Sequence, residues 1–390
     1  MPSYIPFVNS RLECQIVHEL YADAPVLRIS LQRIGDLGDL PQKPQLWLDP
    51  SADVLHHPRQ TLSESWWKYL CQFPHADRLF SPEFLAKPDR SVVREFARGM
   101  LEECVKHRPA WITVPQIPVT DDSSRNKINR TLAEAAGDWK RSGAFKGKLI
   151  LPLVFTHARQ VTYKTRRDDK VRLALDWCGK ADAEGIWTVD STLNDQEGSG
   201  PLDKRFGKLI ELQRDLFAEA GHHLILVGGP YWGMNLVLWS RGLLTHAAIG
   251  LGSSYQYRVP GRKGGRQRAV RIALPPLRRW ARSSGQLRDW LREALKRLSP
   301  NDRAHKDLVA LHSQYDATWD EDRGKKQVAA FYKRWYDLLD GVPSTGRALA
   351  LYQDLSSAFV VGKALPPLPP TEQTARRPEI VAQQLMLKCL

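Results

Sequence analysis

The chain has 390 residues, of which 42% are hydrophobic and 26% are charged, and this balance is typical of a soluble globular protein. No apolar run approaches the roughly 20 residues that a membrane-spanning helix needs, and the first 20 residues lack the pattern of a secretory signal. We therefore expect a cytoplasmic protein without a membrane partner. The five cysteines are scattered and never spaced C-x-x-C, which argues against a disulfide framework and a cysteine zinc site.

Short aliphatic runs recur along the first two thirds of the chain. They are continuous rather than alternating, which favours strands buried on both faces of a parallel sheet. The two earliest are the weakest, because the link between them is too short for an ordinary covering helix. The eight candidate strands are 25–31, 46–49, 111–117, 149–155, 186–191, 224–229, 247–252 and 269–274.

Helical patterns separate several of these strands, for example at 92–101, 128–139 and 206–217. A repeated strand-helix-strand order predicts parallel strands with right-handed crossovers. We therefore predict a (β/α)8 TIM-like barrel over residues 1–276. The alternative is an open doubly wound sheet, but no phosphate-binding glycine loop follows the first strand.

The pattern changes after Pro275 and Pro276. Residues 277–390 show helical patterns, such as 328–339, and no convincing strand. We predict a C-terminal all-helical extension that packs on the barrel or contacts a protein partner.

In such a barrel the chemistry lies at the C-terminal ends of the strands, where the loops converge on one mouth. Asp190 and Asp49 each end a predicted strand, and paired carboxylates there suit glycosyl-transfer or hydrolytic chemistry. Each is also a candidate helix N-cap. We predict Asp190, Asp49 and His157 as the catalytic residues.

Further polar, glycine and aromatic residues follow the other strand ends. Glycines allow a ligand to approach the backbone and leave N–H groups free, although plain strand-to-helix turns also use them. No second histidine lies at ligand spacing from His157, so we predict neither a metal nor a cofactor. The predicted substrate-binding residues are Gln116, Gly228, Gly229, Tyr231, Trp232 and Ser253.

The formal net charge is +14, and the excess is unevenly placed. No acidic residue lies between Glu219 and Asp289, and arginines crowd the second half of this stretch. A concentrated positive potential beside aromatic residues favours a nucleic-acid partner, either DNA or RNA, although a solvated basic loop is the simpler alternative. The predicted nucleic-acid contacts are Arg258, Arg262, Lys263, Arg266 and Arg268.

Three hypotheses follow from these patterns. The first is an enzyme that acts on a nucleobase, a nucleotide or a glycosidic bond with strand-end carboxylates. The second is a non-catalytic nucleic-acid-binding or complex-assembly protein. The third is a small-molecule barrel enzyme whose basic face is incidental.

Overall fold

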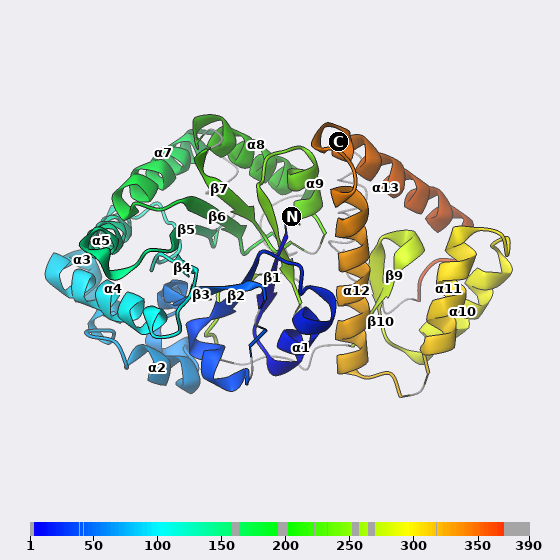
Figure 1. Cartoon of the computed structure of the whole chain (residues 1–390), viewed down its shortest axis with the longest axis horizontal. Coiled ribbons are helices and arrows are strands. Elements are labelled where there is room, and N and C mark those ends of the chain that lie inside the picture. Colours follow the sequence, from blue (N-terminus) through cyan, green and yellow to red (C-terminus); the bar gives the residue numbers. More distant parts are fainter. Residues whose placement is uncertain are drawn as a thin grey trace.

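A closed barrel of eight parallel strands forms the centre of the molecule (Figure 1). The computed structural model describes residues 4–38, 40–41, 43–157, 164–193, 202–220, 223–231, 233–251, 257–263, 270–316 and 318–369. Neighbouring strands pair in chain order, and the last pairs with the first. The TIM-like barrel is therefore confirmed, and the open sheet is excluded. Its strands are β1 (Tyr4–Val8), β2 (Val26–Ser30), β3 (Gln45–Asp49), β4 (Trp111–Thr113), β5 (Lys148–Phe155), β6 (Gly185–Asp190), β7 (Ile225–Gly228) and β8 (His246–Gly250).

One of the eight predicted barrel strands is wrong. The run at 269–274 forms β9 (Arg271–Leu274), which pairs antiparallel with β10 (Arg279–Arg282) in a separate two-stranded sheet. The missing barrel strand is β1, which pairs in parallel with both β2 and β8. Pro6 lies at its centre, and a proline has no N–H group for a ladder, so this segment gives a weak strand signal. The prediction of no strand after residue 277 is also wrong, because β10 lies there.

Helices cover the outside of the barrel, and those predicted at 92–101, 128–139, 206–217 and 328–339 are present. The short link after β2 contains only a 3-10 helix, η1 (Leu31–Asp36), as its length requires. The α-helices are α1 (Arg11–Leu20), α2 (Glu64–Leu70), α3 (Pro82–Ala86), α4 (Arg90–Val105), α5 (Ser123–Trp139), α7 (Lys164–Ala181), α8 (Leu202–Ala220), α9 (Asn235–Ser240), α10 (Gly285–Lys296), α11 (Arg303–Gln314), α12 (Glu321–Asp340) and α13 (Arg347–Ala364). Shorter helical turns are η2 (Ala52–His56), η3 (Arg59–Thr61), η4 (Arg78–Phe80), η5 (Lys140–Ala144), η7 (Pro275–Leu277) and η8 (Ser344–Gly346).

Side-chain caps fix the start of several helices. Ser10 accepts a hydrogen bond from the Glu13 N–H at the start of α1, and Glu13 in turn accepts one from the Asn9 N–H. Asp89 and Asp122 cap α4 and α5 in the same way, through the N–H two residues further on. Each cap satisfies a backbone donor that the helix leaves unpaired.

Two layers of buried side chains follow from the alternation along the strands. Outward-facing residues such as Ile29, Leu48 and Ile186 pack against the surrounding helices. Inward-facing residues fill the barrel, and their cluster consists of Ile5, Phe7, Val26, Trp47, Trp111, Ile150, Val154, Trp187, Val189, Val227, Ala248 and Tyr257. Five of these twelve residues are aromatic, so large rings, together with aliphatic side chains, close the barrel interior.

The helix that packs beside β1, between α1 and α9, is α12, from the last quarter of the chain. Its side chains belong to the same buried cluster as those of the barrel helices. The Tyr336 hydroxyl donates to Asn235 Oδ1 on α9 at 2.9 Å, and the Tyr21 hydroxyl donates to the Ala329 carbonyl at 2.7 Å. Figure 1 shows α12 between the barrel and the unit formed by β9, β10, α10, α11 and α13. Packing of α12 therefore crosses the predicted boundary at residue 276.

That unit has a buried cluster of its own. Ile272 and Leu274 of β9 pack with residues of α10 and α11, and Leu365 and Leu368 close the cluster after α13. The Arg278 guanidinium binds both carboxylate oxygens of Asp354 on α13, at 2.7 and 2.6 Å. The C-terminal extension thus packs directly against the barrel, through α12.

We expect Tyr336→Phe to lower the free energy of unfolding by about 1–3 kcal/mol, because it leaves the buried Asn235 Oδ1 without its donor. Urea unfolding followed by circular dichroism measures the change. Tyr352→Phe on α13 is the matched control, since the Tyr352 side chain is 44% exposed and should tolerate the loss. Equal stabilities of the two variants would contradict the role given to α12.

Candidate active site at the barrel mouth

A buried ion pair lies inside the barrel near the C-terminal ends of β2 and β3. Arg28 Nη2 donates to Asp49 Oδ2, and their side chains are 2% and 3% exposed. Arg28 and Asp49 each lie two residues beyond a lumen residue, Val26 and Trp47, so both point inward. Removing either partner would leave a charge buried without compensation, which is costly in a low-dielectric interior.

Aromatic rings surround the Arg28 guanidinium. Its central carbon lies 5.0 Å from the Phe7 ring centroid, 5.4 Å from that of Trp187 and 5.5 Å from that of Tyr257. Cations over aromatic faces are stabilised electrostatically, more so when water is excluded. Arg28 Nε has no hydrogen-bond partner among the described residues. Burial lowers the pKa of Arg28, against the opposing effects of Tyr257 and Asp53.

A second buried carboxylate, Asp53, completes this network from the turn after β3. The Tyr257 hydroxyl donates to Asp53 Oδ2, whereas Asp53 Oδ1 has no partner within the described residues. Burial raises the pKa of Asp53 to about 6, although the hydrogen bond from Tyr257 and the charge of Arg28 oppose the rise. A carboxyl group that changes its protonation near neutral pH is suited to proton transfer.

Two loops are joined over this network by backbone hydrogen bonds. The loop after β3 and the loop after β8 form an antiparallel bridge between Leu62 and Arg262. The Ser63 N–H donates to the Gly261 carbonyl and the Lys263 N–H to the Thr61 carbonyl, both at 2.7 Å. Gly261 has φ +103°, and a Cβ there would lie 2.2 Å from Val54 Cγ2, so only glycine permits this approach. The loops that carry Asp53 and Tyr257 are therefore held together.

The structure does not bring Asp190 into this network. Trp187 and Val189 face the lumen, so Asp190 at the end of β6 faces the helix layer and is fully buried there. Its Oδ1 accepts from the Thr192 N–H at 2.9 Å, and its Oδ2 lies 3.5 Å from Arg205 Nη2 on α8. These contacts match the capping alternative. The predicted pair of facing carboxylates, Asp49 and Asp190, is therefore not formed, and the carboxylates near Arg28 are Asp49 and Asp53.

The described glycine and tyrosine residues predicted to bind substrate after β7 make packing and hydrogen-bond contacts within the protein. The Gly229 N–H donates to the Thr188 carbonyl at 3.2 Å, and so it is engaged. A Cβ on Gly228 would lie 2.6 Å from Leu244 Cδ1, which explains the absence of a side chain. Tyr231 is 1% exposed and its hydroxyl donates to the Thr188 carbonyl, which favours the core-packing alternative. Trp232 and Ser253 lie outside the described residues.

Gln116 and His157 lie in the loops after β4 and β5. Gln116 is 3% exposed and donates through Nε2 to the Asn129 carbonyl at 2.9 Å. Its Oε1 has no partner in the part of the chain that the structure describes. His157 is exposed and lies close enough to His56 to affect its titration. His157 is therefore near the mouth, outside the buried network.

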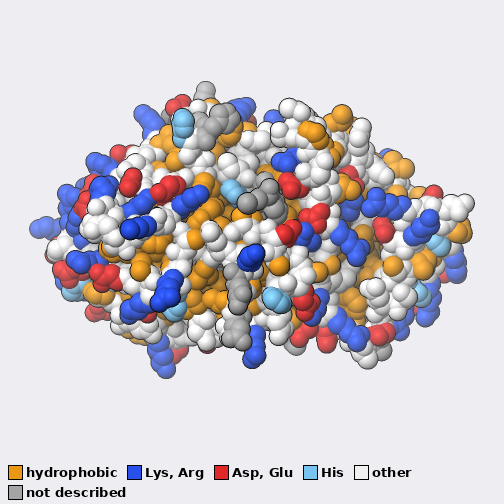
Figure 2. Space-filling model, viewed as in Figure 1, with side chains coloured by type: hydrophobic (Ala, Val, Ile, Leu, Met, Phe, Trp, Pro, Cys, Tyr) orange, Lys and Arg blue, Asp and Glu red, His pale blue; other side chains and the backbone are white. Residues whose placement is uncertain are grey.

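Three of the five predicted nucleic-acid contacts are described. Arg258, Arg262 and Lys263 are exposed, and Arg262 lies near His57 at the joined loops. Arg266 and Arg268 lie outside the described residues. On the face shown in Figure 2, Lys and Arg side chains are spread around the margin among Asp and Glu, with apolar side chains towards the centre.

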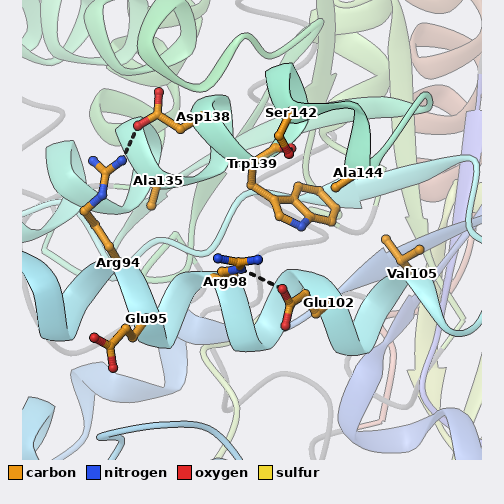
Figure 3. A pocket seen from close by; sticks show the side chains of 10 residues that line it. All are labelled: Arg94, Glu95, Arg98, Glu102, Val105, Ala135, Asp138, Trp139, Ser142 and Ala144. Atoms are coloured by element: carbon orange, nitrogen blue, oxygen red, sulfur yellow. Dashed lines mark hydrogen bonds and ion pairs between the residues drawn. The ribbon is translucent and has the colours of Figure 1, made fainter.

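A groove of about 480 Å³ lies elsewhere, between α4 and α5 (Figure 3). Arg98 pairs with Glu102 at 2.7 Å, and Arg94 pairs with Asp138 across the two helices. Because these charges neutralise each other on the outer helix layer, the groove lacks the unpartnered groups of the mouth.

Sequence reasoning missed Arg28 and Asp53 and considered Tyr257 only as an aromatic neighbour of the basic block. A signal for Arg28 exists, because it interrupts the aliphatic run 25–31 at an otherwise buried strand position. Asp53 lies four residues beyond β3 and carries no such mark.

The chain matches no protein-family model and no curated protein sequence. Across the residues that the structure describes, no group of three or more His, Cys, Asp or Glu side chains could hold a metal ion. None of the described helices is long and apolar enough to cross a membrane.

We expect Asp53→Asn to gain stability relative to the wild type as the pH rises. The pKa of Asp53 is raised, so the folded wild type binds the proton more tightly and loses stability between its unfolded value of 3.8 and about 6. The variant has no such loss. Between pH 4.5 and 7.5 the difference in unfolding free energy should move towards the variant by about 2 kcal/mol. Urea unfolding at both pH values measures it, and a constant difference would show that Asp53 titrates normally.

Proposed function

We propose that this chain is a barrel enzyme that acts on a nucleotide or nucleic acid, with Asp53 as its proton-transfer group. The observation that carries the proposal is a buried carboxyl group with a raised pKa, bonded by Tyr257 and influenced by the charge of Arg28, one of whose oxygens has no hydrogen-bond partner among the described residues. This group lies at the C-terminal end of the barrel, which is where enzymes of this fold carry their active sites.

The chemistry that this arrangement supports best is cleavage of a glycosidic bond. Protonated Asp53 donates its proton to the leaving nitrogen while the C1′–N bond breaks, and water adds its hydroxyl group to C1′ and its proton to Asp53. Atoms and charge then balance, with a free base and a sugar as products. Asp49, fixed by Arg28, supplies a negative charge near the positive charge that develops on the sugar.

The substrate class follows from the charge at the mouth. Arg262 and Lys263 are exposed on the loop that is joined to the Asp53 loop. Phosphate groups are attracted to such side chains, and the contacts weaken steeply with added salt. This supports a phosphate-bearing substrate over an uncharged one.

Incubation of the protein with RNA and DNA oligonucleotides and with nucleoside monophosphates tests the chemistry, with free nucleobase measured by mass spectrometry. Asp53→Asn should lower the rate of release by about 100-fold or more, because the proton donor is lost. Asp289→Asn on α10, a carboxylate that is 74% exposed, should leave the rate unchanged. Binding without base release by the wild type would favour the non-catalytic binding protein instead.

The double variant Arg262→Glu and Lys263→Glu tests the substrate class. It should weaken oligonucleotide binding by about 100-fold at low salt and reduce the salt dependence by about two counterions, one for each phosphate contact. Filter binding at several salt concentrations measures both quantities. Lys296→Glu and Arg292→Glu on α10 change the net charge equally and should have a much smaller effect. Equal weakening by the two double variants would point to a general charge effect.

A further inference from the structure

A group of arginine and histidine side chains lies at the barrel mouth on four different loops. His56 and His57 follow β3, Arg125 lies in the first turn of α5 after β4, His157 follows β5, and Arg262 follows β8. We call these five residues the mouth cation cluster. The ends of β3, β4 and β5 are adjacent because these strands pair with one another, and the joined loops bring Arg262 to them.

The two neighbouring histidines are held in place by local contacts. Their ring centroids are 5.5 Å apart with the ring planes at 63°. His57 Nε2 lies 3.4 Å from the Val259 carbonyl oxygen, across the joined loops. His56 Nδ1 is buried and has no hydrogen-bond partner within the described residues.

Mutual repulsion marks the cluster as electropositive. Burial, together with the positive charges of His57, Arg125 and His157, lowers the pKa of His56 to about 4. Burial also lowers the pKa of His57, with Arg262 adding to the effect and the carbonyls of Val259 and Pro260 opposing it. Each of these neighbouring charges is positive, so an anion placed among them would be stabilised.

Three members of the cluster have side chains without a partner among the described residues. Over the described ranges of the chain, the side chains of Arg125, His157 and Arg262 take part in no hydrogen bond or ion pair. The carboxylates at the start of α5 are engaged elsewhere, since Asp121 binds Lys170 at 3.1 Å and Asp122 caps the helix. Arginines are usually used in pairs with carboxylate or phosphate groups, and among the described residues no protein group fills that role for Arg125 or Arg262.

We propose that the mouth cation cluster binds one phosphate group of the substrate, a tetrahedral dianion that the arginines contact from two sides. This inference rests on the proposed function, because it names the group by which that substrate is held near Asp53. The histidines donate hydrogen bonds to the phosphate oxygens, and a bound dianion favours their protonated form. The cluster thus makes the protein bind a nucleotide with a terminal phosphate more tightly than a nucleoside.

Sulfate is the probe for the test, because it remains a dianion over the whole range in which histidines titrate. We expect sulfate to bind the full-length protein with an affinity at least fivefold higher at pH 5.5 than at pH 7.5, measured by titration calorimetry. Arg125→Gln and His57→Gln should each weaken sulfate binding by about tenfold. Arg292→Gln on α10 and His75→Gln, whose side chain binds Glu95, remove equivalent groups elsewhere and should leave the affinity unchanged.

The failure of this inference and that of the proposed function can be told apart. Asp53→Asn should bind sulfate as the wild type does, since it lies outside the cluster. If base release depends on Asp53 but sulfate binding is unchanged in the Arg125 and His57 variants, the phosphate site is overturned. The proposed enzymatic reaction would still stand. Sulfate binding that depends on the cluster, with no base release, would support the site and reject the reaction.

Discussion

Arg28 is the constraint on which the arrangement of the mouth depends. A guanidinium that is 2% exposed inside a barrel must be paired, because an isolated buried charge costs several kcal/mol. Asp49 forms the ion pair with Arg28, and the rings of Phe7, Trp187 and Tyr257 surround the guanidinium. Asp53 is a second carboxyl group close to it. Each of these residues comes from a different strand or loop, so one buried cation specifies how the strand ends meet.

The same constraint separates the two kinds of carboxylate at the strand ends. Asp190 is also buried, but both of its oxygens are occupied by Thr192 and Arg205 on the helix side of the barrel. Asp53 keeps one oxygen without a hydrogen-bond partner in the part of the chain that the structure describes, and it lies near a tyrosine and an arginine. A satisfied carboxylate holds structure together, whereas an incompletely satisfied one retains capacity for a ligand or a proton. That difference is why the proposal rests on Asp53.

The barrel and most of its helices could be predicted from sequence, because buried parallel strands such as β5 and β6 are continuous aliphatic runs. The identity of the first and last strands could not, since Pro6 weakens the signal of β1 and β9 has the same composition as a barrel strand. Placement at a strand end was predictable for Asp49 and Asp190. The direction in which each side chain points could not be predicted. A shift of one residue along the strand turns a side chain from the lumen towards the helix layer. The position of Asp53 depends on the path of the turn after β3, which the local sequence does not encode.

The position of α12 has a consequence for how the molecule is made. The eighth strand ends at Gly250, yet the helix that packs beside β1, between α1 and α9, begins at Glu321. A chain that emerges from the ribosome must therefore add about ninety further residues, to the end of α12 at Asp340, before the apolar flank around Tyr4 and Tyr21 is covered. During that interval the apolar surface of this flank is exposed on the nascent barrel. Chaperones, or rapid synthesis of the last third, would protect that surface from aggregation. The first strand of the barrel thus reaches its final packing only after a helix about three hundred residues later in the chain has been made.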